Sequence, residues 1–343
     1  MGRLNCYHVK NDINIITATG YGATGSSAIT HILSEFSNVK SYGDAEFWFL
    51  QDIDGISDLE YFLLDGNHRS KTFVAIKKFE SYILKNKNFY SKFLPDYLSL
   101  SKEYLNSLKY VTFKKSIHPF EYRNSFVKSL TVKIYYKLQK IYHILFKKNT
   151  EMILKLPKNT KYHFIQDKKL FYKLTRDYTR KLFNSGIKSD DISHLIIDQL
   201  VPCNNVSRYL NYIDKMKVIV VDRDPRDLFL LDKLVWKGSP VLCETKDLKT
   251  FIKWYKSIRY NADLNDTKEV LRLNFEDLVY DYDKSILKII KFCQLDNKKH
   301  SLKKQFFNPK ESINNTRCWD KTNKYKTEIE IIEKELKEYC YEY

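Results

Sequence analysis

The stretch from Thr19 to Ala28 reads Thr-Gly-Tyr-Gly-Ala-Thr-Gly-Ser-Ser-Ala, and it decides the fold. An apolar run, Ile13 to Ala18, precedes it and predicts a strand. Apolar residues at the spacing of a helix with one buried face follow it: Ala28, Ile29, Ile32, Leu33 and Phe36. A strand, a glycine-rich turn and a helix N-terminus form an anion-binding cradle, because the first N–H groups of the helix point at the ligand.

One position of this loop departs from the usual phosphate-binding pattern. Gly20, Gly25 and Ser27 fit the spacing G-x-x-x-x-G-K-[ST], but Ser26 stands in place of the lysine. The loop therefore keeps a pattern that holds a phosphate and lacks the charge that serves transfer of the terminal phosphate of ATP.

Composition places the chain among globular proteins with ample core. Its 343 residues are 43% hydrophobic and 29% charged, as in ordinary soluble domains. Six scattered cysteines form no C-x-x-C pair, which argues against a zinc site or a disulfide framework, and we expect no metal cofactor. No apolar signal segment precedes the first predicted strand, so the sequence predicts a cytoplasmic protein.

The net charge of +17 is concentrated in residues 91–190, where 22 lysines and arginines face seven acidic residues. Such asymmetry predicts an anionic partner: an acidic glycan, a lipid surface or nucleic acid. No nucleic-acid-binding module accompanies the charge, which argues against the last of these. The alternative is that the lysines only solvate helices.

Within this basic block, residues 127–146 predict an amphipathic helix. Lys133, Lys137 and Lys140 fall on one helical face; the other face is apolar and carries Leu130, Ile134, Leu138, Ile141 and Leu145. Four lysines in its length argue against crossing a membrane. The helix either lies on a membrane surface or packs on a neighbour.

Strands and helices alternate outside the block. Strands are expected at 39–42, 194–197, 217–221 and 270–273, and helices at 56–64, 73–84, 206–213, 225–236, 248–262, 284–293 and 327–339. This alternation predicts an α/β fold, P-loop-like, with three α/β/α layers around a central parallel sheet. We expect a single domain over residues 1–343, with residues 91–190 as a basic, mainly helical insertion.

A second anion site is predicted after the strand at 217–221, which runs into Asp222-Arg223-Asp224-Pro225-Arg226-Asp227. Ligands bind at the carboxyl ends of parallel strands, and an arginine there can fork onto a phosphate. Two anion sites at neighbouring strand ends predict a nucleotide with phosphates at both ends of its ribose.

These elements resemble the sulfotransferases that use 3′-phosphoadenosine 5′-phosphosulfate (PAPS). The segment 271–279, Leu-Arg-Leu-Asn-Phe-Glu-Asp-Leu-Val, resembles the family's Arg-Tyr-Glu-Asp-Leu-Val stretch, and Asn314 to Trp319 resembles the late segment that closes over the nucleotide. The resemblance covers residues 13–50 and 193–320 and skips the basic block. It implies that PAPS is the co-substrate.

The resemblance also implies roles for single residues. The loop that holds the 5′-phosphosulfate would comprise Gly20, Gly22, Ala23, Thr24, Gly25, Ser26 and Ser27. Arg223 would bind the 3′-phosphate with help from Arg317, and Trp319 would cover the adenine. Arg226 and Asp227 are interpreted instead as a local ion pair at a helix start.

Two positions depart from the family pattern. Ala23 stands where a lysine or arginine usually stabilises charge on the leaving oxygen, and Leu231 stands where a serine is usual. Lys77, Lys78 and Lys233 are candidates to supply that charge; otherwise transfer activity has been lost.

The acceptor hydroxyl needs a base, and Glu46 is our choice. We expect Phe47, Trp48 and Phe49 beside it to raise its pKa by desolvation. Asp44 and His68 are further acceptor-side candidates, and Asp198 and Gln199, at the end of another strand, are placed to hold acceptor or donor groups.

The sequence thus predicts a sulfotransferase-like enzyme that modifies a glycan or its lipid-linked precursor. Richness in Lys, Asn, Ile and Tyr indicates an AT-rich genome and points to a bacterial surface polysaccharide pathway. Two alternatives stay open. One is a P-loop kinase with Asp222 as a metal-holding residue, and the other is a nucleotide- or membrane-binding module without turnover.

Overall fold

The computed structural model describes residues 13–66, 68, 71–108, 110–116, 126–146, 157–163, 167–237, 245, 247–260, 262–263 and 265–343. Contacts divide the chain into two units. The sheet unit consists of the described residues of Met1–Gln51, Lys92–Asp96 and Arg176–Tyr343. The hairpin unit consists of those of Asp52–Ser91 and Tyr97–Thr175, so its bounds differ from the expected insertion at 91–190.

Five parallel strands in the order β2-β5-β1-β6-β7 form the core of the sheet unit. They are β1 (Asn14–Gly20), β2 (Val39–Glu46), β5 (His194–Asp198), β6 (Met216–Asp222) and β7 (Val270–Asn274). The central strands β1, β5 and β6 are mainly apolar and largely buried, as is usual for strands covered on both faces. The parallel α/β sheet is thus confirmed.

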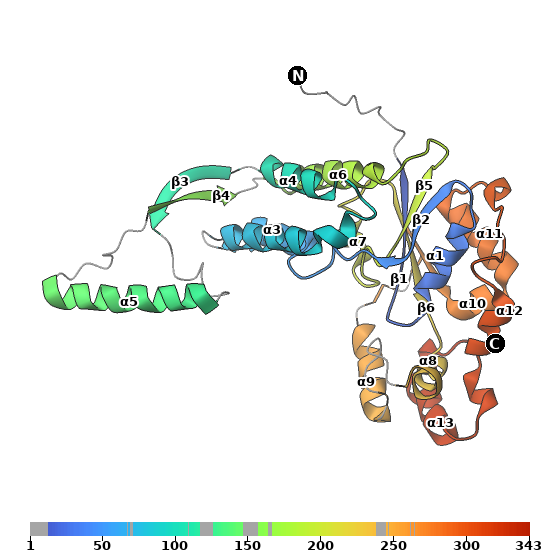
Figure 1. Ribbon diagram of the computed structural model, residues 1–343. Coiled ribbons are helices and arrows are strands. Elements are labelled where there is room, and N and C mark those ends of the chain that lie inside the picture. Colours follow the sequence, from blue (N-terminus) through green and yellow to red (C-terminus); the bar gives the residue numbers. More distant parts are fainter. Residues whose placement is uncertain are drawn as a thin grey trace. The chain divides into compact units, whose positions relative to one another are not determined.

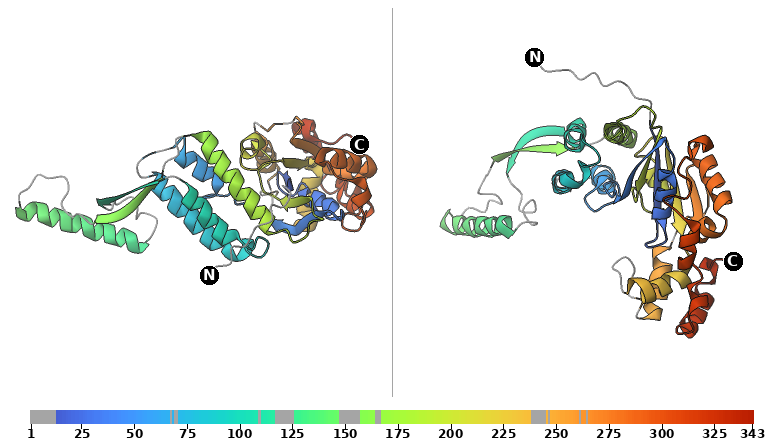
Figure 2. Two further views of the ribbon diagram at one scale, coloured as in Figure 1. Left: turned by 90° about the horizontal axis from the view of Figure 1, so that it is seen from above. Right: turned by 45° about the vertical axis from the view of Figure 1, so that its right-hand side comes forward.

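Helices α1 (Ser26–Ser34), α10 (Phe275–Tyr280) and α11 (Tyr282–Cys293) pack on one face of this sheet. Figure 1 shows them on the same side of β1 and β6, and the orange segment of α11 stays on that side in both views of Figure 2. Ile29, Ile32 and Ile289 are fully buried there against alternate residues of the strands. The other face holds the second half of α6 (Lys168–Ser185), where Thr179 donates to the Tyr212 carbonyl.

A second apolar cluster lies past the carboxyl end of β6 (Figure 1). It joins α8 (Pro225–Leu231), α9 (Leu248–Ile258) and α13 (Lys326–Glu335). The helix expected at 225–236 continues as a π-helical turn from Asp232 to Trp236, and the helix expected at 248–262 ends at Ile258. The shorter segments of this unit are α7 (Val206–Tyr209), α12 (Pro309–Ser312) and turns at Asn297–Lys299, Ile313–Asn315, Cys318–Lys321 and Lys337–Tyr339.

The hairpin unit is built from helices and one antiparallel strand pair. Its elements are α2 (Ile56–Leu63), α3 (Lys71–Tyr90), α4 (Tyr97–Ser107), β3 (Tyr110–Ser116), α5 (Phe126–Phe146), β4 (Pro157–His163) and the first half of α6. Strands β3 and β4 pair from Tyr110↔His163 to Ser116↔Pro157, and α5 lies between them in the chain. The predicted amphipathic helix at 127–146 is therefore present as α5.

A buried carboxylate at the end of α1 joins the first and last thirds of the sheet unit. Glu35 is fully buried, and its Oε1 accepts hydrogen bonds from the backbone N–H groups of Phe306 and Phe307, both at 3.1 Å. Its Oε2 lies 2.8 Å from Nε2 of His300, whose ring stacks on Phe36 at 4.3 Å. One side chain therefore satisfies three donors that come from distant sequence.

We expect Glu35→Ala to lower the free energy of unfolding by about 3 kcal/mol, because it leaves buried donors without an acceptor. Urea denaturation of the variant and the wild type measures this difference. Glu330→Ala, which removes an exposed glutamate from α13, is the matched control and should change stability by less than about 0.5 kcal/mol. Equal losses in both variants would contradict the assigned role of Glu35.

Candidate functional site

The loop between β1 and α1 has the backbone of an anion-binding cradle. Gly22, Ala23 and Gly25 have positive φ angles of 93°, 53° and 96°. Left-handed residues of this kind occur in the backbone turns whose N–H groups bind anions. Gly25 is the N-cap of α1 and offers no side-chain acceptor, so the first N–H groups of the helix lack a capping side chain.

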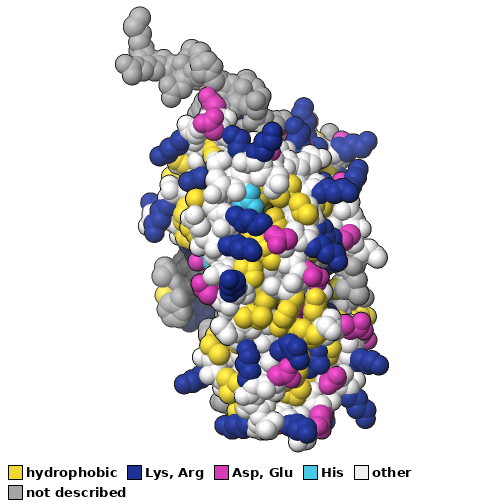
Figure 3. Space-filling model, turned by 90° about the vertical axis from the view of Figure 1, so that its right-hand side faces the viewer, with side chains coloured by type: hydrophobic (Ala, Val, Ile, Leu, Met, Phe, Trp, Pro, Cys, Tyr) yellow, Lys and Arg dark blue, Asp and Glu magenta, His cyan; other side chains and the backbone are white. Residues whose placement is uncertain are grey.

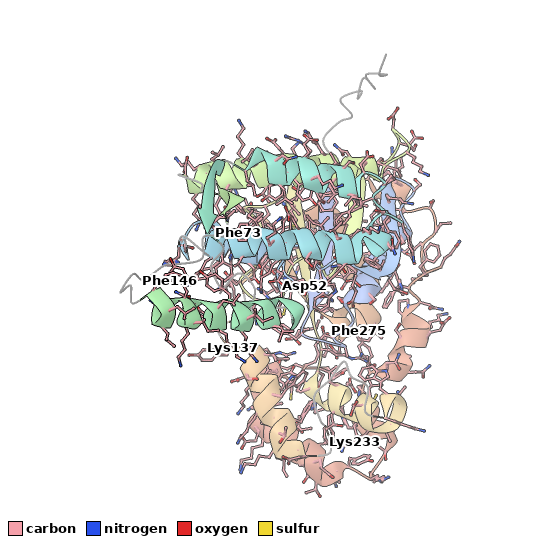
Figure 4. The ribbon with its side chains drawn as sticks, turned by 60° about the vertical axis from the view of Figure 1, so that its left-hand side comes forward. Asp52, Phe73, Lys137, Phe146, Lys233 and Phe275 are labelled. Carbon is pink, nitrogen blue, oxygen red and sulfur yellow. The ribbon has the colours of Figure 1, made fainter. Side chains whose placement is uncertain are left out.

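Close packing holds the loop against β6. Thr24 Oγ1 donates to the Val221 carbonyl at 2.7 Å, and a Cβ on Gly20 would lie 2.1 Å from that same Oγ1. A Cβ on Gly25 would lie 2.5 Å from the ring of Phe275, which is labelled in Figure 4. Both glycines are therefore required by contact, and Gly25 also by its left-handed backbone conformation.

The end of β5 holds the loop from its other side. Gln199 Nε2 donates to Ser26 Oγ at 2.9 Å, and Thr19 Oγ1 donates to Gln199 Oε1 at 3.2 Å. Ser26, which replaces the usual lysine, is therefore a tethering point of the loop. The structure places the predicted residue Gln199 beside the cradle.

Two carboxylates meet on the neighbouring strand ends. Glu46 on β2 pairs in register with Asp198 on β5, and the Phe47 N–H donates to the Asp198 carbonyl at 2.9 Å. Asp198 is 2% exposed, its Oδ1 has no hydrogen-bond partner, and its carboxylate accepts a hydrogen bond from Ser27. Burial, and secondarily the charge of Glu46, raises the pKa of Asp198 to about 7.

The expected desolvation of Glu46 is wrong. Its side chain is exposed and accepts a hydrogen bond from Trp48 Nε1 at 3.0 Å, whereas Phe47 and Phe49 are buried in the core. The strand is irregular between Ser41 and Glu46, and this changes which side chains face the interior. Asp44 is also exposed and lies 2.9 Å from His31 Nε2 on α1.

Arg223 lies directly past the end of β6, where the sequence predicts an anion-binding arginine. It is 5% exposed, its guanidinium stacks on the Phe275 ring at 4.3 Å, and it donates to the Asn315 carbonyl. Its Nε is buried without a hydrogen-bond partner. Burial lowers the pKa of Arg223 and raises that of the neighbouring Glu276 to about 8.

The next polar residues of this segment serve structure. Arg226 forms an ion pair at a helix start with Asp224, at 2.7 Å, whereas Asp227 accepts from the backbone N–H groups of Arg317 and Cys318. The Tyr341 N–H also donates to Asp224, at 2.9 Å. Asp224 and Asp227 thus anchor distant segments at the edge of the site.

Arg317 and Trp319 lie at this edge and already have contacts. Trp319 packs its ring on the Arg226 guanidinium at 4.1 Å and against Tyr343. Arg317 pairs with Asp320 at 2.6 Å. Their expected contacts with a nucleotide stay predictions.

The two departures from the family pattern have structural explanations. Ala23 occupies a left-handed position and packs against the α8–α9–α13 cluster. Leu231 is 3% exposed inside that cluster, so it is a core residue. Lys233 lies over the Phe229 ring at 5.2 Å.

Three residues that lie beside β6 and β7 were not identified from the sequence. Arg259 forms a bidentate ion pair with Asp222 and stacks on the ring of Tyr21, 4.2 Å away. Tyr21 and Arg272 line a cavity of about 570 Å³ beside β6 and β7, and the Tyr21 hydroxyl and Arg272 Nε are buried there without hydrogen-bond partners. The only sequence signal was a charge within the otherwise apolar strand 270–273.

The strands carry an ordered series of functional groups, all at strand ends except Arg272, which lies in the middle of β7 in register with Val220. In sheet order, Glu46 belongs to β2, Asp198 to β5, the anion-binding loop to β1, Arg223 follows β6 and Arg272 belongs to β7. The guanidinium groups lie on the β6 and β7 side of the loop, where Asp222, Asp224 and Glu276 also lie.

Three predicted residues belong to the hairpin unit. Lys77 and Lys78 on α3 pair with Glu80 at 2.5 Å and with Asp54 at 2.8 Å. His68 precedes α3, and its carbonyl accepts from the N–H of Lys71. Their roles in catalysis and acceptor binding stay predictions. Within the described ranges, no group of three or more His, Cys, Asp or Glu side chains is arranged to hold a metal ion.

No protein-family model and no curated protein matches the chain. Among solved structures, the sulfotransferase domain of the Synechococcus PCC 7002 olefin synthase matches 88% of this chain and 79% of its own, with 14% identity and a TM-score of 0.35. The sulfotransferase domain of the curacin biosynthetic pathway matches 95% and 97%, with 12% identity and a TM-score of 0.36. Retinol dehydratase, solved with androsterone and the inactive cofactor PAP, matches 96% and 82%, with 13% identity and a TM-score of 0.31.

We expect Asp198→Asn to change the pH dependence of stability. The native pKa of about 7 lies above the ordinary value, so the folded protein binds more protons than the unfolded chain, and stability falls as pH rises toward 7. The wild type should lose about 3 kcal/mol more than the variant between pH 5 and pH 8. Urea denaturation at both pH values measures this, with exposed Asp65→Asn as the control. Parallel pH profiles for wild type and Asp198→Asn would contradict the assignment.

Proposed function

We propose that this protein is a sulfotransferase that moves a sulfuryl group from PAPS to a hydroxyl of a glycan or a lipid-linked glycan precursor. The observation that carries the proposal is the order of groups across the sheet: Glu46 and Asp198 at the ends of β2 and β5, then the anion-binding loop, then Arg223 after β6 and Arg272 within β7. Sulfuryl transfer needs a proton acceptor on one side of an anion and positive charge on the other. The motif order in the sequence supports the same reaction.

The loop binds through backbone groups and lacks the usual lysine, which favours a phosphosulfate donor over ATP with its terminal phosphate. The cradle of Gly22, Ala23 and Gly25 offers N–H donors at the start of α1 but no lysine side chain. Arg223 retains an unpartnered Nε at the next strand end, and a second phosphate on the same nucleotide would satisfy it. PAPS carries its phosphosulfate and its 3′-phosphate on opposite sides of one ribose.

In the proposed reaction, the acceptor oxygen attacks the sulfur atom. The bond between sulfur and the bridging phosphate oxygen breaks, and 3′-phosphoadenosine 5′-phosphate (PAP) leaves with the electron pair. The hydroxyl proton passes to Glu46, because its carboxylate is the exposed member of the pair. Asp198 is a positioning residue that faces Glu46 from the neighbouring strand and accepts from Ser27 at the start of α1.

Negative charge grows on the bridging oxygen as PAP leaves, and Ala23 contributes nothing to neutralise it. Arg272 is our candidate within the sheet unit, because it lines the cavity beside Tyr21 with an unpartnered, buried Nε. Lys77 and Lys78 remain candidates from the hairpin unit.

The substitutions at Ala23 and Leu231 favour one alternative, a module that binds the nucleotide without turnover. Both side chains are committed to the apolar cluster of α8, α9 and α13, where a cation or a hydroxyl would be out of place. Turnover distinguishes this alternative from the enzyme. A kinase is disfavoured because Ser26 replaces the loop lysine.

Calorimetric titration of PAP and of adenosine 5′-monophosphate tests the donor site. We expect the wild type to bind PAP at least about tenfold more tightly, because charge-assisted hydrogen bonds to a second phosphate contribute about 1.5–3 kcal/mol. Arg223→Gln should bring the ratio of the affinities for PAP and the monophosphate toward one, and the variant should still bind the monophosphate. Thermal melting of the variant verifies that it is folded.

PAP binding by the wild-type protein tests the donor assignment without any variant. Failure of the folded protein to bind PAP would overturn the donor assignment. An unchanged preference in folded Arg223→Gln would move the 3′-phosphate site to another residue.

We expect Glu46→Gln to lower the rate of sulfate transfer by about 10²–10⁴-fold, because the amide accepts no proton. Transfer from PAPS to a panel of glycan acceptors, without added metal, measures the rate. PAP binding should be unchanged in this variant, and Glu330→Gln serves as the control for an exposed glutamate. Equal rates for Glu46→Gln and the wild type would exclude Glu46 as the base. PAP binding without transfer by the wild type to any acceptor would support the non-catalytic module.

A further inference from the structure

Helix α5 exposes an apolar face that a packed helix would bury. Along that face, five aliphatic side chains are between 50% and 70% exposed, namely Leu130, Ile134, Leu138, Ile141 and Leu145. Ile144 and Phe146, at the end of the helix, are 67% and 56% exposed. An apolar stripe of this length usually marks an interaction surface.

The charge of α5 has one sign. Residues 126–146 contain four lysines, Lys128, Lys133, Lys137 and Lys140, and no aspartate or glutamate. Figure 4 labels Lys137 on this helix, and Lys133, Lys137 and Lys140 are all exposed. By contrast, Figure 3 shows basic and acidic side chains interspersed on the face that carries α11 and α12.

This pattern argues against two common occupants of an apolar helix face. A second copy of α5 offers the lysines no carboxylate to pair with, because residues 126–146 contain none. Insertion across the bilayer would place the same lysines in hydrocarbon, which is costly. No helix among the described residues is both long and apolar enough to span a membrane.

We propose that α5 docks on the surface of an anionic lipid bilayer, with its axis in the plane of the membrane. The five aliphatic residues enter the boundary between headgroups and acyl chains, and the lysines contact anionic headgroups. The chain arrangement suits this role, because α5 connects the paired strands β3 and β4 within the hairpin unit. The proposal does not depend on the sulfotransferase assignment, since it concerns binding and not turnover.

The test is co-sedimentation of the full-length protein with vesicles. One set contains phosphatidylcholine alone, and the other contains about 30% phosphatidylglycerol, each at low and high salt. We expect binding to the anionic vesicles at least about tenfold stronger than to the neutral ones, and weaker binding at high salt because surface charges are then screened.

Two variants separate the parts of the surface. The triple substitution Lys133→Gln, Lys137→Gln and Lys140→Gln should remove the preference for anionic vesicles. The double substitution Ile134→Ser and Leu138→Ser should weaken binding at least about tenfold with all lysines in place. The matched control, Lys85→Gln with Lys87→Gln and Lys102→Gln, removes three exposed lysines from α3 and α4 and should bind as the wild type does.

Three outcomes would overturn the proposal. They are absence of binding to anionic vesicles by the folded wild type, equal binding to neutral and anionic vesicles, and equal losses in the α5 and control triple variants. Because vesicle binding needs neither PAPS nor an acceptor, failure here leaves the donor-site titration unaffected, and failure there leaves this result unaffected.

Discussion

The hydrogen bond from Thr24 Oγ1 to the Val221 carbonyl is the constraint on which the site depends. It connects the loop after β1 to the carboxyl end of β6 at 2.7 Å. Only a residue without a Cβ at position 20 leaves room for it. With Thr24 fixed, Ala23 and Gly25 are held at positive φ angles, as in the backbone turns that bind anions. The same bond sets the loop next to Arg223, which follows β6 directly. A polar hydroxyl buried among strands thus organises both proposed anion contacts.

The charged and anion-binding groups of this protein come together on neighbouring strands of the sheet, although they are far apart in the sequence. Neighbouring strands carry an acid pair, a neutral backbone cradle and two guanidinium groups, of which Arg272 lies within its strand and the rest at strand ends. These residues span positions 22 to 272 of the sequence. Arg259 shows the contrast with a purely structural arginine, since both of its donors to Asp222 are satisfied and its faces pack on Tyr21 and Tyr255. Arg223 and Arg272 each keep a buried, unpartnered nitrogen. Unsatisfied buried donors are expensive in a native protein, so they indicate a role beyond stability.

Apolar spacing and glycine positions predicted the strands, loop and helices that depend mainly on neighbouring residues. The strand, loop and helix from Ile13 to Phe36 follow from apolar spacing and glycine positions, and so do the strands that begin near His194, Met216 and Val270. The partnership of Glu46 with Asp198 could not be predicted, because it joins residues 152 positions apart through an irregular strand. That irregularity also reversed the expected burial, and Asp198 became the desolvated carboxylate. Helical spacing likewise identified α5 but said nothing about whether a neighbour covers it.

The contact of Tyr341 with Asp224 has a consequence for biosynthesis. A ribosome releases the loop at residues 20–25 long before it makes residue 341, yet Asp224, at the edge of the same site, takes one of its donors from the Tyr341 N–H. Contacts of such long sequence separation form late, because the intervening chain must be ordered first. A nascent chain therefore exposes the rim of its anion site, with Asp224 lacking one hydrogen-bond donor, until residue 341 has been made. The newly made protein should depend on chaperones for longest in this region, where segments 117 residues apart have to meet.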